Sequence, residues 1–216
     1  MQRIHAAALA AALLAGTAAH ATDLNSASDP ALAGAALVDF EGGPTGTFSS
    51  QSFGALTVTA LPSSEIGSPV FSVGNDYAGQ YNTRGDFHIT NYGSQFEALR
   101  FDFGASTSAF GFLLGATDAS WTLNAYDSSN HLLATRTIAP VFGSDNGDYF
   151  GFSGLSGASY ATFTQNFDGV YANGGVDYTF VDDFRVSSAV PEPASPALLL
   201  AGLGLVGFAA RRRKSA

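Results

Sequence analysis

The sequence predicts an all-β fold: a two-sheet antiparallel β-sandwich of the jelly-roll type, between an N-terminal signal helix and a single C-terminal transmembrane helix. Runs rich in Val, Thr, Phe and Tyr recur at short intervals along residues 37–189, as they do in short strands. Clusters of Gly, Ser, Asn, Asp and Pro separate these runs and are typical of turns. Between the termini, no stretch of sequence has a helical period long enough to compete. A closed barrel is the alternative architecture.

The first 21 residues have the pattern of a secretory signal peptide. Arg3 supplies a positive charge, residues 6–16 form an apolar run of mostly Ala and Leu, and Ala19 and Ala21 give the small-x-small pattern of signal peptidase sites. We therefore expect signal peptidase to cleave after Ala21. A retained N-terminal anchor is the alternative, although the apolar run is short for a membrane span.

Residues 22–36 form a polar, Ala-rich lead-in, which we expect to be a flexible arm. The following residues, 37–189, have the length of one domain, which can build a core without the disulfides that this cysteine-free chain lacks. The expected strands of this domain cover residues 37–41, 52–61, 70–73, 87–92, 97–103, 109–114, 121–126, 132–138, 149–152, 160–167 and 177–186.

Alternation of apolar and polar residues supports individual strands. Leu99, Phe101 and Phe103 form the apolar face of one expected strand. A polar turn at residues 127–130 predicts a hairpin between the strands on either side of it. In the last strand, Asp182 falls on the aromatic face, where a buried carboxyl group needs a partner.

The region between the two termini is strongly acidic. Residues 22–190 contain four arginines and no lysine against seventeen Asp and Glu residues, so their net charge is −13, compared with −9 for the whole chain. Such a surface repels phosphate backbones and anionic headgroups, and we expect no nucleic-acid partner. The charge suits cations and uncharged partners such as sugars.

Four carboxylates are expected to meet where the first and last strands lie side by side. Asp39 and Glu41 share one face of the opening strand, and Asp182 and Asp183 belong to the closing strand. Such a cluster is stable when it is protonated, hydrogen-bonded to backbone amides or neutralised by a hard cation such as calcium. These residues are candidate ligands of a structural calcium ion; solvated edge acids and capping of loop amides are the alternatives. The arrangement resembles the structural calcium site of carbohydrate-binding β-sandwich modules.

The segment 75–89 is a candidate glycan-binding rim between two expected strands. It places Tyr77, Tyr81, Arg84 and Asp86 in a polar, Gly-containing stretch, where loops can form a binding surface and tyrosine rings can stack on sugars. A long irregular loop whose tyrosines cover the edge of the core is the alternative.

Other candidates for chemistry are weaker. Residues 143–148 alternate oxygen-bearing side chains like a calcium loop but lack the distal glutamate, so a plain acidic turn is favoured. His88 and His131 have no zinc spacing, and Trp121 is expected in the core. The chain has no cysteine nucleophile and no Gly-x-Ser-x-Gly elbow, and chance pairs among so many acids are no evidence for a glycosidase. We therefore expect no catalytic residue.

The C-terminal tail, residues 190–216, differs in composition from the rest of the chain. It begins with two prolines flanking one residue, which disrupt helices and sheet ladders alike, in the segment Val190, Pro191, Glu192 and Pro193. Residues 194–210 are uncharged, and as a helix they would cover about 25 Å, slightly less than the hydrocarbon core of a bilayer. A basic end follows and would hold the C-terminus in the cytoplasm; it consists of Arg211, Arg212, Arg213 and Lys214.

This order of parts resembles the PEP-CTERM sorting signal of Gram-negative bacteria, and the resemblance covers the last 27 residues. It implies transient insertion in the inner membrane and recognition by an exosortase, a membrane cysteine protease. It further implies processing near residues 191–193 and delivery to the outer surface or an exopolysaccharide matrix. An ordinary C-terminal membrane anchor is the alternative.

Three hypotheses for the function result. The one that we favour is a non-catalytic exported protein of the cell surface or exopolysaccharide matrix, with polysaccharide as its partner. The second is a lectin-like module that requires calcium. The third is a secreted glycan hydrolase.

Overall fold

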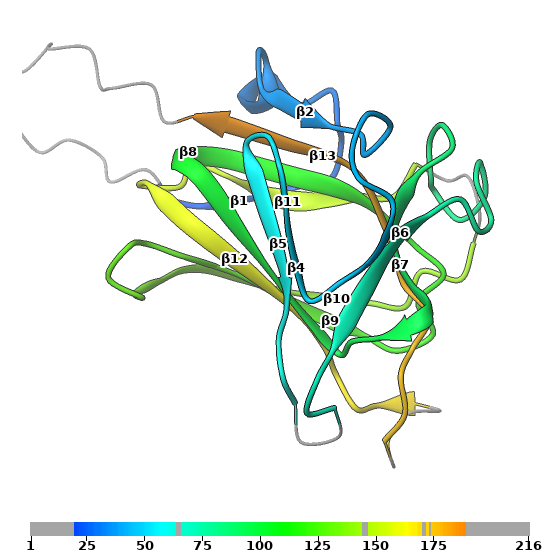
Figure 1. Ribbon diagram of the computed structural model, residues 1–216. Coiled ribbons are helices and arrows are strands. Elements are labelled where there is room, and N and C mark those ends of the chain that lie inside the picture. The colour runs from blue at the N-terminus through cyan, green and yellow to red at the C-terminus, as the bar shows by residue number, and fades with distance from the viewer. Residues whose placement is uncertain (1–19, 64–65, 144–146, 170–171, 173, 189–216) are drawn as a thin grey trace, which may run out of the picture.

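The computed structural model describes residues 20–63, 66–143, 147–169, 172 and 174–188 (Figure 1). The sorting tail, and all but the last two residues of the predicted signal peptide, lie outside them. In the described part of the chain, no helix is long and apolar enough to cross a membrane. The predicted all-β class is confirmed, because this part consists of strands and one 3₁₀ turn, η1 (Pro30–Leu32).

The strands are short, apart from one long strand near the middle of the chain. They are β1 (Thr22–Leu24), β2 (Ala36–Val38), β3 (Gly46–Phe48), β4 (Ser50–Phe53), β5 (Leu56–Ala60), β6 (Val70–Gly74), β7 (His88–Gln95), β8 (Ala98–Gly115), β9 (Trp121–Tyr126), β10 (Leu132–Ile138), β11 (Tyr149–Ser153), β12 (Ala158–Gln165) and β13 (Phe180–Ser188).

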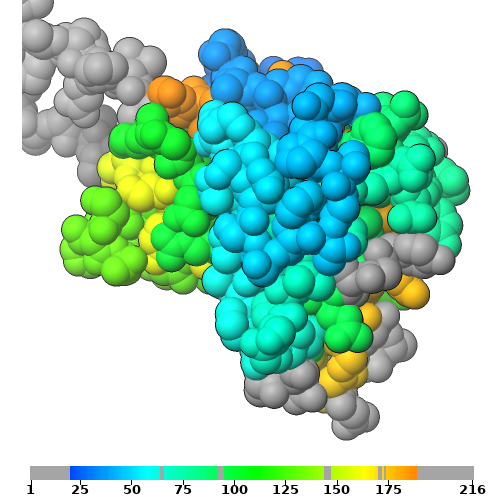
Figure 2. Space-filling model, viewed as in Figure 1, coloured from blue at the N-terminus to red at the C-terminus, as the bar shows by residue number. Residues whose placement is uncertain are grey.

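All of these strands join one antiparallel sheet. Its main path runs in the order β10, β9, β12, β8, β13, β7, β6 and β3, and the remaining strands pair along its sides. The predicted division into two separate sheets is therefore not confirmed, because hydrogen bonds connect the strands continuously. The segment from β2 to β5 covers the centre of one face of the molecule (Figure 2).

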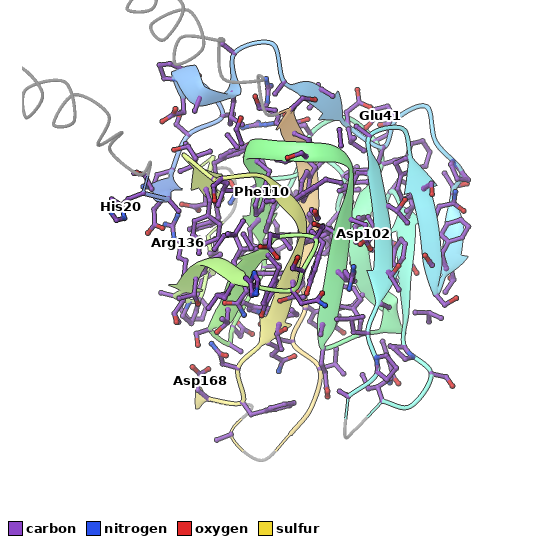
Figure 3. All side chains as sticks on the ribbon, turned by 90° about the vertical axis from the view of Figure 1, so that its left-hand side faces the viewer. His20, Glu41, Asp102, Phe110, Arg136 and Asp168 are labelled. Carbon is purple, nitrogen blue, oxygen red and sulfur yellow. The ribbon has the colours of Figure 1, made fainter. Side chains whose placement is uncertain are left out.

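Strand β8 connects the two halves of this sheet by turning over. Its first part, residues 98–103, pairs with β5 and β12, and its last part, residues 109–115, pairs with β11 and β13. The ring centres of Phe103 and Phe110 are only 4.9 Å apart, so the two parts of the strand face each other. Figure 3 shows the turn at the top of the molecule, with Asp102 on one limb and Phe110 on the other.

The core lies between the facing halves of the sheet and is rich in phenylalanine. The ring of Phe184 in β13 lies 4.9 Å from that of Phe101 and 5.3 Å from that of Phe112. Trp121 stacks on Phe163 at 4.4 Å and is fully buried, which confirms its predicted place in the core. Each such pair contributes about 0.5–1.5 kcal/mol beyond the burial of its area. Aromatic packing therefore holds together a domain that has no disulfides.

Residues 22–36 belong to the fold, which corrects the expectation of a flexible arm. Strand β1 pairs with β11, and the side chains of Leu24 and Leu32 are buried. Arg136 of β10 donates a hydrogen bond of 2.8 Å to the Leu24 carbonyl oxygen, and its Nε lies 3.6 Å from the Asp23 carboxylate. Two buried leucines and a strand ladder thus fix a segment whose composition alone is that of an arm.

The predicted hairpin over the turn 127–130 is confirmed as β9 and β10. The Asp127 Oδ1 atom accepts hydrogen bonds from the backbone N–H groups of Ser129 and His131, at 2.8 and 2.9 Å. These bonds, led by the one from His131, lower the pKa of Asp127. His131 is exposed beside this carboxylate, so its role is that of a turn residue at the surface.

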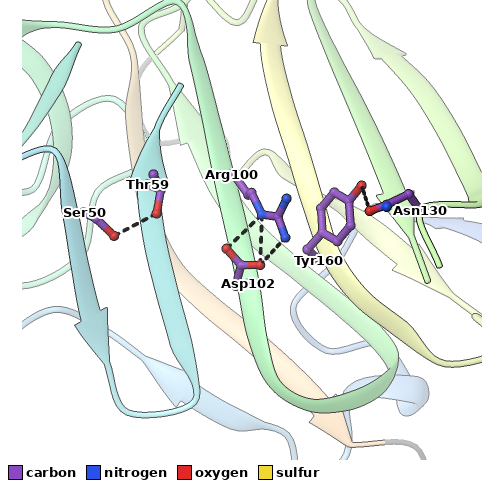
Figure 4. A network of polar contacts seen from close by, with 6 residues as sticks. All are labelled: Ser50, Thr59, Arg100, Asp102, Asn130 and Tyr160. Atoms are coloured by element: carbon purple, nitrogen blue, oxygen red, sulfur yellow. Dashed lines mark hydrogen bonds and ion pairs between the residues drawn. The ribbon is translucent and has the colours of Figure 1, made fainter. Parts of the chain in front are cut away.

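A polar network lies on the outer face of β8 and β12 (Figure 4). The Arg100 Nη2 atom lies 2.6 Å from Asp102 Oδ1, and the guanidinium group lies 3.8 Å from the centre of the Tyr160 ring. The Tyr160 hydroxyl donates a hydrogen bond of 3.0 Å to Asn130 Oδ1. Because the Arg100–Asp102 ion pair is partly exposed, it contributes modestly to stability, and the members of the network satisfy one another without a ligand.

Candidate functional site

An aromatic pocket lies where the loop between β6 and β7, on the right of Figure 1, meets the segments that follow β8 and precede β13. Its volume of about 350 Å³ is within the range of ligand sites. Three of its rings are exposed: Phe142 by 68%, Tyr178 by 53% and Tyr77 by 43%. Exposed large rings gathered in one hollow mark a binding surface. The pocket is lined by Tyr77, Tyr81, Ala116, Asp118, Phe142, Tyr178 and Phe180.

Ring contacts hold the two tyrosines of the β6–β7 loop in place. Tyr81 stacks on Phe180 with 5.6 Å between ring centres, and Tyr77 meets the edge of Tyr81 at 5.7 Å. His88 of β7 packs against Phe180 at 5.1 Å, and burial lowers the pKa of His88 to about 4, so its ring is neutral at pH 7. A Cβ atom at Gly115 would lie 1.8 Å from the Tyr81 carbonyl oxygen, so only glycine lets the loop approach β8 this closely.

The backbone around the pocket is strained. Seven described non-glycine residues have a positive φ, and four of them are Tyr77, Tyr81, Asn82 and Ala116, with φ between 51° and 63°. This left-handed conformation costs free energy for residues with a Cβ atom and persists only where the surroundings enforce it. The contacts that enforce it here are those that place the pocket's rings.

Asn82 anchors the β6–β7 loop to neighbouring segments of the domain. Its side chain is buried, and its Nδ2 atom donates to the Leu114 carbonyl oxygen at 2.8 Å and to Asp148 Oδ2 at 3.2 Å. Its Oδ1 atom accepts a bond of 2.8 Å from the Gly147 N–H group. One amide therefore ties the loop to the end of β8 and to the acidic turn, of which residues 144–146 lie outside the described part of the chain.

Two of the four predicted calcium ligands bind backbone amides of this same loop. The Glu41 Oε1 atom accepts hydrogen bonds from the N–H groups of Asp86 and Phe87, at 2.8 and 2.9 Å. The Asp182 Oδ2 atom accepts a bond of 2.6 Å from the Arg84 N–H group. The amide-capping alternative thus describes Glu41 and Asp182, neither of which is among the described residues that line the pocket.

The four acids also influence one another, because β2 pairs with β13 and brings their segments together. Burial raises the pKa of Asp182 to about 8, and the charges of Asp183 and Glu41 add to this shift. Burial likewise raises the pKa of Asp183, and Asp39 and Glu41 repel its charged form. Within the described ranges, however, no three acids or histidines are placed to hold a metal ion, so calcium remains a prediction.

In calcium-free buffer, we expect the protein to lose stability as the pH rises from 3.8 to about 8. The pKa of Asp182 is about 8 in the folded chain and 3.8 in the unfolded chain, so folding favours the protonated carboxyl group. The stability that results is fully present below pH 3.8 and is lost as the pH rises to about 8. Asp182→Asn keeps an oxygen that can accept from Arg84 and should flatten this dependence. Thermal unfolding of both proteins across this range checks the prediction, and equal pH dependences would contradict it.

Two of the four residues predicted for the glycan-binding rim line the pocket, and two do not. Tyr77 and Tyr81 line the pocket, whereas Arg84 and Asp86 are not among its lining residues and donate their backbone N–H groups to Asp182 and Glu41. Phe142 and Tyr178 escape prediction from sequence, although each is an aromatic residue in a connection between strands, as Tyr77 is. That shared signal could have identified them.

A buried carboxylate fixes the opposite wall of the pocket. Asp177 accepts hydrogen bonds from the N–H groups of Asp118 and Ala119, at 2.8 and 3.0 Å, and from Trp121 Nε1 at 2.9 Å. Burial raises the pKa of Asp177, and these hydrogen bonds oppose that shift. Asp177 therefore connects the tryptophan of the core to the segment that carries Asp118, and it directly precedes Tyr178.

Comparison with known proteins assigns the end of the chain. A partial structural match is the crystal structure of a DUF4465 family protein from Bacteroides caccae ATCC 43185, at 11% identity and a TM-score of 0.36, covering 77% of this chain and 99% of that one. No curated protein matches the sequence. Residues 189–214 match the PEP-CTERM protein-sorting motif, in agreement with the resemblance of the Pro-Glu-Pro, apolar and Arg-rich segments. The protein is therefore one that carries a PEP-CTERM sorting motif at its C-terminal end.

Proposed function

We propose that the mature protein is a non-catalytic component of the cell surface or exopolysaccharide matrix and contacts polysaccharide through the aromatic pocket. The observation that carries this proposal is the sorting motif at residues 189–214, which is the recognition signal for exosortase and indicates export across the membrane to the cell surface. Removal of the tail would leave the β domain as the part that acts outside the cell.

The make-up of the pocket supports binding rather than catalysis. Among the lining residues that the structure describes, Asp118 is the one carboxylate, whereas a glycosidase requires two carboxyl groups on opposite sides of the bond that it cleaves. The remaining lining residues are tyrosines, phenylalanines and an alanine, which offer ring faces and hydroxyl groups. Such surfaces hold sugars by stacking and hydrogen bonding.

A calcium-dependent form of this function is a second candidate, because Glu41 and Asp183 oppose the charged form of Asp182. A bound cation would relieve this repulsion and would stabilise the fold by about 2.7 kcal/mol at a hundredfold excess over its Kd. We would compare the thermal midpoint in calcium with that in chelator, and repeat the comparison with Asp183→Asn. If calcium leaves the thermal midpoint unchanged, the calcium-dependent function is rejected.

The proposal is tested in the producing cell by comparing the full chain with a Phe142→Ala, Tyr178→Ala double variant. Both proteins should reach the outside, because neither residue belongs to the sorting motif. The unaltered protein should remain with the extracellular polysaccharide fraction, and the variant should be released into the medium. Retention of both proteins inside the cell would contradict the exported role, and equal retention by the polysaccharide would contradict contact through the pocket.

A further inference from the structure

We propose that the aromatic pocket binds a pyranose ring carrying a free, protonated amino group, as in a deacetylated amino-sugar polysaccharide. The ring's apolar face packs on the exposed aromatic side chains, and the ammonium group lies toward Asp118. This inference rests on the proposed contact with polysaccharide and adds the chemical class of the sugar.

The aromatic side chains account for recognition of a sugar ring. Six large hydrophobic residues of the described chain are exposed, and Tyr77, Phe142 and Tyr178 bring three of them to this one pocket. Phe142 has no hydroxyl group, so what it offers is its ring, which can pack against the C–H face of a pyranose. Phe180 is buried behind these rings and closes the pocket with an apolar floor.

The charge of the pocket selects among sugars. Asp118 is exposed and lines the pocket, and no Lys, Arg or His is among the lining residues within the described part of the chain. A second carboxyl group, that of Asp177, lies directly behind Asp118 and accepts a hydrogen bond of 2.8 Å from its N–H group. A carboxylate or sulfate on the sugar would be repelled, whereas an ammonium group gains an ion pair with Asp118 and cation–π contacts with the rings.

The pocket is also organised before a ligand arrives. Tyr81 is held by its stack on Phe180, and Asn82 holds the backbone beside it. On the side of the pocket that Asp118 lines, the backbone is fixed by the hydrogen bond that Asp177 accepts from the Asp118 N–H group. Because the backbone of both walls is fixed, less conformational entropy is lost when a sugar binds. The volume of about 350 Å³ leaves room for a sugar ring together with its substituents.

The test uses the mature protein recovered from its producing cell and two oligomers of equal length, one of glucosamine and one of N-acetylglucosamine. Isothermal titration calorimetry should give a Kd at least about tenfold lower for the glucosamine oligomer than for the N-acetylglucosamine oligomer. Added salt should reduce this difference in affinity. Asp118→Asn keeps the backbone N–H group that binds Asp177 and should abolish the preference. Tyr178→Ala should weaken binding of both oligomers.

Phe167→Ala is the matched control, because Phe167 is as exposed as Tyr77 but lies outside the pocket. It should change neither Kd. Equal affinity for the two oligomers overturns the proposal, and so does a preference that survives Asp118→Asn. Binding of neither oligomer also overturns it. The proposed function is judged separately, by whether the full chain reaches the extracellular polysaccharide, so the two failures are distinguishable.

Discussion

Replacing Pro191, Glu192 and Pro193 with alanine is expected to abolish delivery of the protein to the cell surface. The three residues lie near the start of the matched sorting motif, and because proline disfavours helix we expect an extended segment that a protease can reach. Alanine favours helix, so with three alanines a helix predicted for the apolar segment would be free to extend through this site. We expect the full-length protein, with its basic end, to accumulate in the inner membrane, as measured by fractionation of the producing cell.

The control for this experiment is Ser215→Ala. Ser215 lies in the tail but beyond residues 189–214, so its replacement should leave delivery unchanged. Surface delivery of the triple-alanine protein at the level of the unaltered chain would show that the Pro-Glu-Pro segment does not direct sorting.

Replacing Asp177 with alanine is expected to lower the free energy of unfolding by about 3 kcal/mol or more. The buried carboxylate accepts bonds from Trp121 Nε1 and from the N–H groups of Asp118 and Ala119, and its loss leaves these donors without an acceptor. Each buried group left unsatisfied costs about 1–3 kcal/mol. Urea unfolding followed by the fluorescence of the single tryptophan provides the measurement.

Asp168 provides a matched control for this effect. It also accepts hydrogen bonds from the segment between β8 and β9, from the N–H and hydroxyl groups of Ser120, but it is exposed. Water can replace these bonds, so Asp168→Ala should lower the free energy of unfolding far less than Asp177→Ala does. Equal losses for the two variants would contradict the account of Asp177 as a buried anchor.

The pocket and the stability of the domain depend on the same polar anchors. Asp177 holds one wall, whereas Asn82, Glu41 and Asp182 hold the loop that forms the other. Both sets connect irregular segments to strands of the sheet. This explains how aromatic side chains in connections between strands keep a fixed arrangement.

Much of the fold follows from local patterns in the sequence. Leu99 and Phe101 face the core as the alternation predicts, and Trp121 is buried. The hairpin of β9 and β10 follows from its polar turn, and burial of Asp182 follows from its place among aromatic residues. These features depend on residues that are neighbours along the chain, so the sequence contains the information directly.

Features that depend on distant residues escape prediction. The Gly and Ser-rich stretch 104–108 has the composition of a turn between two strands, but the chain continues through it as a single strand that turns over, so one sheet forms. For Glu41 and Asp182, the sequence leaves both a cation and the capping of loop amides open, and only the structure shows which loop amides lie beside them. Phe142 and Tyr178 join the pocket only through the folding of separate connections.

The most direct test of the account is the intact mass of the protein recovered from the outer surface and medium of its producing cell. We predict a chain that begins at Thr22 and ends near residues 191–193, which would demonstrate both cleavages and an exported mature domain. A mass that retains residues 211–214 would mean that the tail is a permanent membrane anchor, and it would contradict the proposed role in the extracellular matrix.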